Sequence, residues 1–165
     1  MSDALELFLE KLDYSMFVVT AAVGDERSGC LVGFVTQCSI HPTRFLVCIS
    51  DKNRTFDLAT RTPAIGLHLV PRDATDLIEL FGGETGDEID KFARTPWSPG
   101  PRGVPLLDGC PSRLACEVIE RIPVGDHLAL LVEPIEAEGG AGAGPEPVFT
   151  MAMARRQAIE PGHPA

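Results

Sequence analysis

The sequence predicts a mainly β domain with short helices. Two polar turns that contain glycine each separate a pair of apolar, strand-like runs, which is the pattern of β-hairpins. Other strand-like runs are joined by short segments with helical spacing, and strands do not alternate regularly with long helices. A chain of 165 residues can bury roughly 70% of its unfolded surface in one core. We therefore expect one domain over residues 1–165.

The N-terminal segment predicts an amphipathic helix that Ser2 or Asp3 can cap. Its apolar face consists of Leu5, Phe8, Leu9 and Leu12. We expect this helix to dock on the barrel that follows. The apolar runs 16–23 and 30–39 come next, and a polar segment bounded by glycines separates them, so they predict a hairpin.

The middle of the chain predicts two further strands, over residues 45–49 and 64–70. The segment between them has helical spacing from about Asn53 onward. Two short helical segments are predicted after the second of these strands, over residues 76–81 and 87–93.

The segment 94–111 contains four prolines before its last residue and predicts an extended loop. Its Trp97 is the only tryptophan of the chain. Trp97 suits a lid or a dimer contact, or it covers an apolar end of the barrel. Residues 113–122 and 128–138 predict a last hairpin, and the glycine-rich segment 139–145 predicts a flexible loop that does not match GxGxxG.

Charge and hydropathy narrow the classes of partner. Acidic residues outnumber basic residues 24 to 14, so the net charge of −10 repels nucleic acid and anionic membranes. No apolar run approaches the roughly 20 residues of a membrane span, and the N-terminus lacks a basic start. We expect a cytoplasmic protein without a nucleic-acid or membrane partner.

Other catalytic and metal sites have little support in the sequence. The five cysteines lack the spacing of a metal site, and three of them lie in apolar runs, so we expect buried free thiols. His41, His68 and His163 do not have ligand spacing on one element. No GxSxG motif is present, which argues against a serine hydrolase.

Polar groups follow the second long apolar run, where a helix is expected to begin. A helix N-terminus has unpaired N–H groups and partial positive charge, and Lys52, Arg54 and Thr55 add two charges and a hydroxyl. This pattern suits a phosphate group. Alternatively, Asn53 or Asp51 only caps the helix while the two cations stay solvated.

The chain resembles the flavin reductase-like family from about residue 14 to residue 138. Three blocks in order carry the resemblance. They are Ser39-Ile40-His41-Pro42 at the end of a strand, Lys52-Asn53-Arg54-Thr55 after the next strand, and Gly125-Asp126-His127 in a tight turn between two strands.

The resemblance implies a split β-barrel of the FMN-binding type. It implies FMN or FAD as cofactor and NADH or NADPH as co-substrate, with hydride transfer from the nicotinamide to the flavin. It also implies a homodimer, and a flavin-dependent monooxygenase as an acceptor of reduced flavin.

The same resemblance implies the residues of the site. The flavin ring and ribityl chain would be held by Val35, Thr36, Gln37, Cys38 and Ser39. The phosphate would be held by Lys52, Asn53, Arg54 and Thr55. His127 would contact the ring or the nicotinamide, and its alternative interpretation is a turn histidine in water.

Two segments differ from the family pattern. His41-Pro42-Thr43 stands where the family often has Asp-Pro-Pro, and Gly33-Phe34 stands where small hydroxyl residues are common. These differences keep an alternative open: a flavin-binding or haem-binding module on the same barrel, without reductase turnover.

Overall fold

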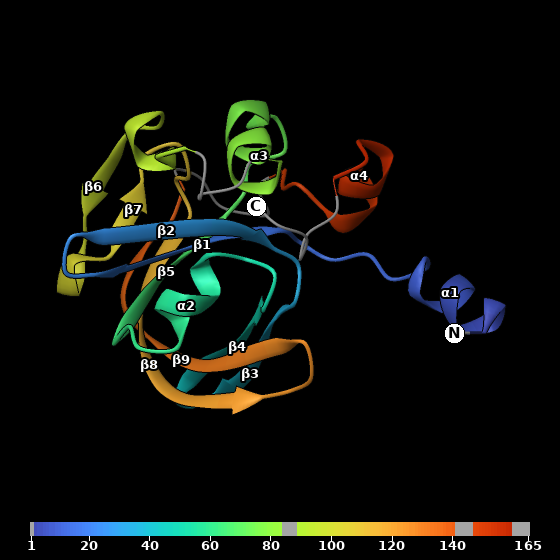
Figure 1. Ribbon diagram of the computed structural model, residues 1–165, viewed down its shortest axis with the longest axis horizontal. Helices are drawn as coiled ribbons and strands as arrows, with labels where there is room; N and C mark the ends of the chain where they lie inside the picture. Colours follow the sequence, from blue (N-terminus) through green and yellow to red (C-terminus); the bar gives the residue numbers. More distant parts are fainter. Residues whose placement is uncertain (1, 84–88, 141–146, 160–165) are drawn as a thin grey trace.

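A curled β-sheet forms the centre of the computed structural model, which describes residues 2–83, 89–140 and 147–159. The sheet has seven antiparallel strands in the order β2-β1-β5-β8-β9-β4-β3. Their bounds are β1 (Phe17–Val23), β2 (Glu26–Val32), β3 (Val35–Ile40), β4 (Thr43–Ser50), β5 (Ala64–Leu69), β8 (Arg113–Pro123) and β9 (His127–Glu138). The sheet forms a barrel that stays open between its edge strands β2 and β3 (Figure 1). The predicted mainly β architecture is confirmed.

The predicted strand 30–39 is in fact divided between β2 and β3. β2 pairs with β1, whereas β3 pairs with β4 on the other edge of the sheet. The chain crosses between the two edges at Gly33 and Phe34. A Cβ atom on Gly33 would lie 2.8 Å from the ring of Tyr14, so only glycine fits this crossing without a shift. The prediction of one strand was wrong because the apolar run continues through the crossing.

The core lies on both faces of β1. Val18 packs with Phe81 and Phe149 outside the barrel, whereas Val19 packs with Ile49 and Leu130 inside it. Successive strand residues point to opposite faces, so one strand contributes to both clusters. The outer cluster is covered by α3 (Thr75–Gly82), and α2 (Thr55–Ala59) packs into the inner one (Figure 1).

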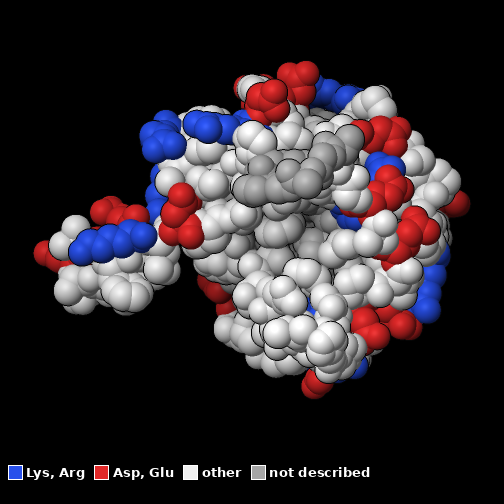
Figure 2. Space-filling view, turned by 180° about the vertical axis from the view of Figure 1, so that it is seen from behind, with Lys and Arg blue, Asp and Glu red and all other residues white. Residues whose placement is uncertain are grey.

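The N-terminal helix α1 (Asp3–Leu9) does not dock on the barrel, contrary to the prediction. It has no buried residue and projects from the body, with its charged side chains on one side and an uncharged side opposite (Figure 2). Ser2 caps it as expected, accepting from the N–H of Leu5 at 3.4 Å. Its far end is held by Arg155 of α4 (Met151–Arg156), which donates to the carbonyls of Leu9, Glu10 and Leu12.

The segment 94–111 is more regular than its prolines predicted. β6 (Trp97–Pro99) and β7 (Pro105–Leu107) form a two-stranded sheet, with the short helices η1 (Lys91–Ala93) before it and η2 (Pro101–Gly103) within it. The prolines are tolerated because such a small sheet is all edge. Trp97 is half-buried and packs against Phe92 with ring centroids 5.9 Å apart, which favours its role as an apolar cover.

All five cysteines are free thiols, but not all are buried. Cys30, Cys110 and Cys116 are buried as predicted, whereas Cys38 is exposed and Cys48 is half-buried. The prediction was wrong for Cys38 because it lies on the edge strand β3, which the core does not cover.

Three further findings concern the described ranges. None of their helices is long and apolar enough to cross a membrane. They contain no group of three His, Cys, Asp or Glu side chains arranged to hold a metal ion. Of the predicted glycine-rich loop 139–145, residues 141–145 lie outside the described residues, as does His163.

Candidate functional site

A small pocket lies at the opening of the barrel, beside the crossing from β2 to β3. Its cavity volume is about 20 Å³. Residues 31–34 form one wall, and the other lining residues come from β4, the loop after it, the start of β9 and α4: Cys48, Ser50, Asn53, His127 and Met151. The pocket therefore joins four stretches of the chain that are distant in the sequence: residues 31–34, residues 48–53, His127 and Met151.

Asn53 lines this pocket and carries a buried polar atom. Its side chain is 5% exposed, and its Oδ1 atom has no hydrogen-bond partner among the described residues. The backbone holds the residue in place, because its N–H donates to the carbonyl of Ser50 and its own carbonyl accepts from the N–H of Phe56. A buried acceptor without a donor costs about 1–3 kcal/mol. This atom is suited to a ligand that carries an N–H or O–H group.

The capping interpretation of Asn53 is not supported. The residue at the N-cap of α2 is Arg54, and no side chain caps the helix. No side-chain hydrogen bond from Asp51 to the start of α2 is described either. The side chain of Asn53 therefore lines the pocket and leaves the helix start uncapped.

His127 is held at the pocket by two contacts. Its Nδ1 lies 2.6 Å from Oδ1 of Asp126, and its ring centroid lies 5.2 Å from that of Phe34. The bond to His127 lowers the pKa of Asp126, so the carboxylate is the acceptor and Nδ1 carries the proton. The side chain of His127 is 17% exposed, which is at odds with a turn histidine in water.

The predicted phosphate residues are divided between different environments. Lys52 and Arg54 are exposed, and Arg54 lines a second pocket rather than the first. Thr55 is buried, and its hydroxyl lies 2.8 Å from the hydroxyl of Ser28. Only Asn53 of these four residues lines the small pocket.

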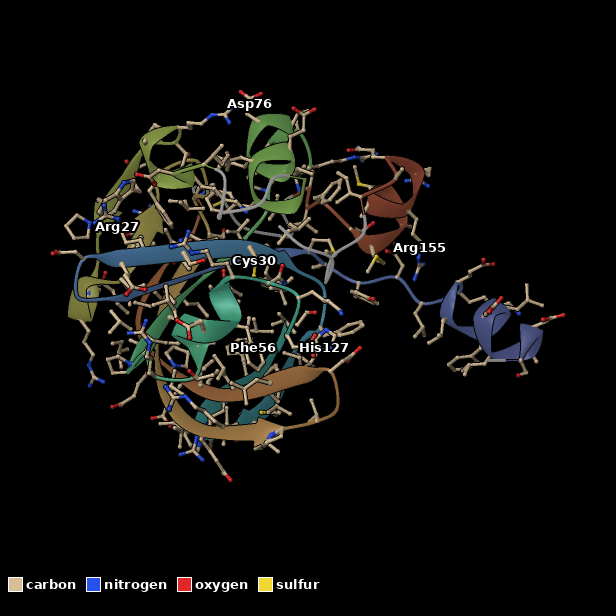
Figure 3. The ribbon with its side chains drawn as sticks, in the orientation of Figure 1. Arg27, Cys30, Phe56, Asp76, His127 and Arg155 are labelled. Atoms are coloured by element: carbon tan, nitrogen blue, oxygen red, sulfur yellow. The ribbon has the colours of Figure 1, made fainter. Side chains whose placement is uncertain are left out.

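The second pocket is larger and lies along the same strand, β2. Its volume is about 430 Å³, and it is lined by residues 25–29, Arg54 and residues 89–92. Figure 3 shows Arg27 toward one end of β2 and His127 toward the other. Both pockets are therefore lined in part by β2, toward different ends of the strand.

The residues predicted to hold the ring lie beside the small pocket and do not line it. Thr36, Gln37 and Cys38 are exposed on β3, and Val35 and Ser39 are half-buried. The wall of the pocket is instead formed by the four residues that precede them. A glycine inside an apolar run, Gly33, is the sequence signal that marks a close approach of the backbone.

The chain is similar to flavin-dependent proteins over most of its length. The family described as "Flavin reductase like domain" matches residues 9–158. The "FMN reductase (NADH) RutF" of Pseudomonas syringae is 28% identical over 117 residues, which are 71% of this chain and 65% of that protein. This chain therefore spans slightly less than two thirds of that relative.

Two further similarities concern a reductase component and a solved structure. The reductase component of the FADH(2)-dependent resorcinol hydroxylase of Rhizobium sp. is 26% identical over 132 residues, which are 79% of this chain and 73% of that protein. The structure of an FMN-binding protein from Thermus thermophilus with bound p-hydroxybenzaldehyde has a TM-score of 0.74 at 26% identity. The matched region covers 80% of this chain and 75% of the chain of the FMN-binding protein.

Proposed function

The chain belongs to the family of flavin reductase-like domains, and from this membership we propose that it is an NAD(P)H-dependent flavin oxidoreductase. FMN or FAD supplies the chemistry when bound, because it accepts a hydride from NADH or NADPH. The protein has to hold the flavin and the nicotinamide in contact and to exclude water from between them.

The observation that supports a flavin site most directly is the unpartnered Oδ1 atom of Asn53. A flavin carries donors that suit it, namely the ring N3–H and the ribityl hydroxyls. A donor placed there would satisfy the buried acceptor and recover the free energy that its desolvation costs.

The size of the small pocket determines how the ring would lie. A cavity of about 20 Å³ holds about one water molecule, so a tricyclic ring cannot enter it. We place the ring across the mouth of the pocket, against the aromatic pair of Phe34 and His127. The exposed polar groups of residues 35–39 would then border the ring from β3, which keeps these residues as part of the proposed site.

Two positively charged side chains lie beside the pocket. Lys52 and Arg54 are adjacent to Asn53 in the chain and are both exposed. The side chain of Thr55 is bonded to Ser28, and a hydroxyl group can donate and accept at once, so Thr55 stays part of the proposal.

His127 is the residue we assign to the reacting rings. Since its Nδ1 donates to Asp126, Nε2 is the nitrogen available to a ligand. The contact with Asp126 also fixes the orientation of the ring. We propose that His127 positions the flavin or the nicotinamide through Nε2.

Two assembly partners are part of the proposal. One relative is the reductase component of a flavin-dependent hydroxylase. This supports a flavin-dependent monooxygenase as the acceptor of reduced flavin. We also propose a homodimer, since exposed apolar side chains on α1, β8 and β9 would be covered by a second copy. A cytoplasmic location stays a prediction from the sequence.

A second candidate function is a flavin-binding module without turnover. The narrow pocket and the bulky Phe34 at its mouth favour it, because they restrict the room for a nicotinamide above a bound flavin. No described contact favours a haem in place of the flavin.

The experiment that tests the proposal is an anaerobic titration followed by visible absorbance. Addition of FMN or FAD should shift the flavin spectrum, and NADH or NADPH should then bleach it. A flavin that binds but is not bleached would favour the module. No spectral change at tens of micromolar flavin would contradict both functions.

A further inference from the structure

We propose that Tyr14 is a further flavin-binding residue, whose ring extends the aromatic surface of Phe34 and His127 at the mouth of the small pocket. The inference rests on the proposed placement of the flavin ring, and it names a residue that none of the three sequence blocks contains. Tyr14 is the only tyrosine of the chain and precedes β1. It does not line the small pocket, so it can meet only a ring that lies outside the cavity.

The three rings form a continuous series of contacts. The ring centroid of Tyr14 lies 6.1 Å from that of Phe34, and the ring centroid of Phe34 lies 5.2 Å from that of His127. Both distances fall in the range of roughly 4.5–7 Å at which aromatic rings attract each other. Phe34 therefore connects the other two rings, which come from distant parts of the chain.

The shape of the flavin ring system suits such a series. An isoalloxazine consists of three fused rings, and with its methyl and carbonyl groups it is longer than the 5.2 Å between the ring centroids of Phe34 and His127. A flavin that lies across this pair therefore has ring surface left for a third contact. A further aromatic side chain beside Phe34 can stabilise that part of the ligand by stacking or by an edge contact.

The backbone of Tyr14 is fixed by the C-terminal segment. Its carbonyl accepts from the N–H of Met151 at 2.9 Å, and Met151 lines the small pocket. Oδ1 of Asp13 accepts from the N–H of Tyr14 at 3.0 Å and from the N–H of Ala152 at 2.9 Å. Tyr14 is thus held in register with a wall of the pocket before a ligand binds, which lowers the cost of ordering it on binding.

Gly33 allows the ring of Tyr14 to lie close to the crossing between β2 and β3. A Cβ atom on Gly33 would lie 2.8 Å from Cε2 of Tyr14, so the ring occupies the space that a side chain would need. Gly33 itself lines the small pocket. Since Tyr14 is half-buried, part of its surface stays accessible beside this wall.

The phenol of Tyr14 is neutral when a ligand binds near pH 7. Burial raises its pKa above the ordinary value. A neutral ring can be covered by an apolar ligand at a lower cost than a charged one. Tyr14 also packs against the outer core cluster, so its test has to separate flavin binding from stability.

The test compares the wild type with Tyr14→Leu and Tyr14→Phe in titrations with lumiflavin, riboflavin and FMN, followed by visible absorbance. Lumiflavin carries the ring system without the ribityl chain and the phosphate. Tyr14→Leu should raise the dissociation constant about fivefold for all three ligands, the loss expected from one aromatic contact. Tyr14→Phe keeps a ring and should restore the affinity to within about twofold of the wild type.

Phe8→Leu is the matched control for Tyr14→Leu. It also replaces an aromatic ring by an apolar side chain, and Phe8 is 61% exposed on α1 and lines neither pocket. The control should bind each flavin as the wild type does. Urea unfolding of the ligand-free proteins shows whether each variant is folded under the conditions of the titration.

The fluorescence of the bound flavin is a readout that a purely structural role of Tyr14 would not change. A phenol in contact with an isoalloxazine quenches its emission, because the phenol donates an electron to the excited ring and then regains it. A phenyl ring does not donate in this way. FMN bound to Tyr14→Phe should therefore emit more strongly than FMN bound to the wild type.

The outcomes separate this inference from the proposed function. Equal affinities of Tyr14→Leu and the wild type, or a loss confined to FMN, would overturn the inference and leave the flavin site standing. Equal emission of FMN bound to Tyr14→Phe and to the wild type would also overturn it, and this result decides if Tyr14→Leu does not fold. If lumiflavin, riboflavin and FMN all fail to bind the wild type, the proposed function is wrong and the inference falls with it.

Discussion

The ring of His127 lies 5.2 Å from the ring of Phe34, and this pair connects the two sides of the barrel opening. Phe34 belongs to the crossing between β2 and β3, and His127 is the first residue of β9. β9 pairs with β4, and His127 lies opposite Ser50 in that pairing. The contact between His127 and Phe34 therefore places the β4 side of the small pocket against its β2 side. The site thus depends on contacts between segments that are far apart in the chain.

Phe34→Ala is expected to weaken flavin binding. Phe34 is 52% exposed, and its ring would stack on a flavin that lies across the mouth of the pocket. An aromatic pair contributes about 0.5–1.5 kcal/mol beyond burial, so the dissociation constant should rise about tenfold. Fluorescence titration measures this change. Ile40→Ala, at an exposed position of β3 outside the pocket, is the control and should bind as the wild type does. Tighter binding by Phe34→Ala would contradict the proposed stacking.

Asn53→Ala is expected to weaken flavin binding without making the ligand-free protein less stable. Without ligand, the variant removes a buried acceptor that has no described partner, so the apo protein should be at least as stable as the wild type. With flavin, it loses a hydrogen bond, and the dissociation constant should rise about tenfold. Urea unfolding with and without saturating FMN tests both parts. An unstable apo variant would show that Asn53 serves the fold rather than a ligand.

The buried neutral ring of His68 is expected to make the protein less stable in mild acid. Its Nε2 accepts from the N–H of Leu107 and its Nδ1 lies 3.0 Å from the carbonyl of Val18, so the ring must be neutral and donate from Nδ1. Burial lowers the pKa of His68 to about 4. The unfolded chain takes up a proton near the ordinary pKa of about 6.5, and the folded protein does not. Stability is therefore complete above pH 6.5 and falls as the pH drops toward 4.

The size of this effect follows from linkage. Between pH 6.5 and pH 5 the free energy of unfolding should fall by about 2 kcal/mol from His68 alone. Urea unfolding at several pH values gives the slope. His68→Gln is less stable at pH 7 but should show a much flatter dependence over this interval. An equal slope in both proteins would mean that another group takes up the proton.

The cysteines should differ sharply in reactivity. Burial raises the pKa of Cys30 to about 11 and that of Cys110 and Cys116 to about 12, so their thiolates are scarce at neutral pH. Cys38 is exposed. Brief treatment of the native protein with iodoacetamide should label Cys38 first, and half-buried Cys48 more slowly. Mass spectrometry of peptides measures the labelled fraction of each cysteine. Early labelling of Cys30 would contradict the described core.

Local signals in the sequence were sufficient for most of the fold. The turns at Gly24 and Gly125 have positive φ angles, which explains why glycine marks both hairpins. The break at Gly33 escaped prediction because the apolar pattern does not change where the chain moves from one sheet edge to the other. The exposure of α1 also could not be read from its pattern, since an amphipathic helix does not say what covers its apolar face.

Only those residues of the small pocket that belong to local motifs could be predicted from the sequence. Asn53 and His127 were found from local motifs, and the pocket brings them together. Cys48, Ser50 and Met151 were missed because they reach the pocket through strand pairing and through the packing of α4, neither of which has a local signature. The roles of residues 35–39 and of Lys52, Arg54 and Thr55 stay predictions.

The central claim is that a bound flavin satisfies Asn53, and a crystal structure of the chain with excess FMN tests it most directly. We expect the isoalloxazine ring across the mouth of the small pocket, with a flavin N–H or ribityl O–H within hydrogen-bond distance of the Asn53 Oδ1 atom. An FMN molecule bound away from Asn53, or no FMN at saturating concentration, would contradict the account.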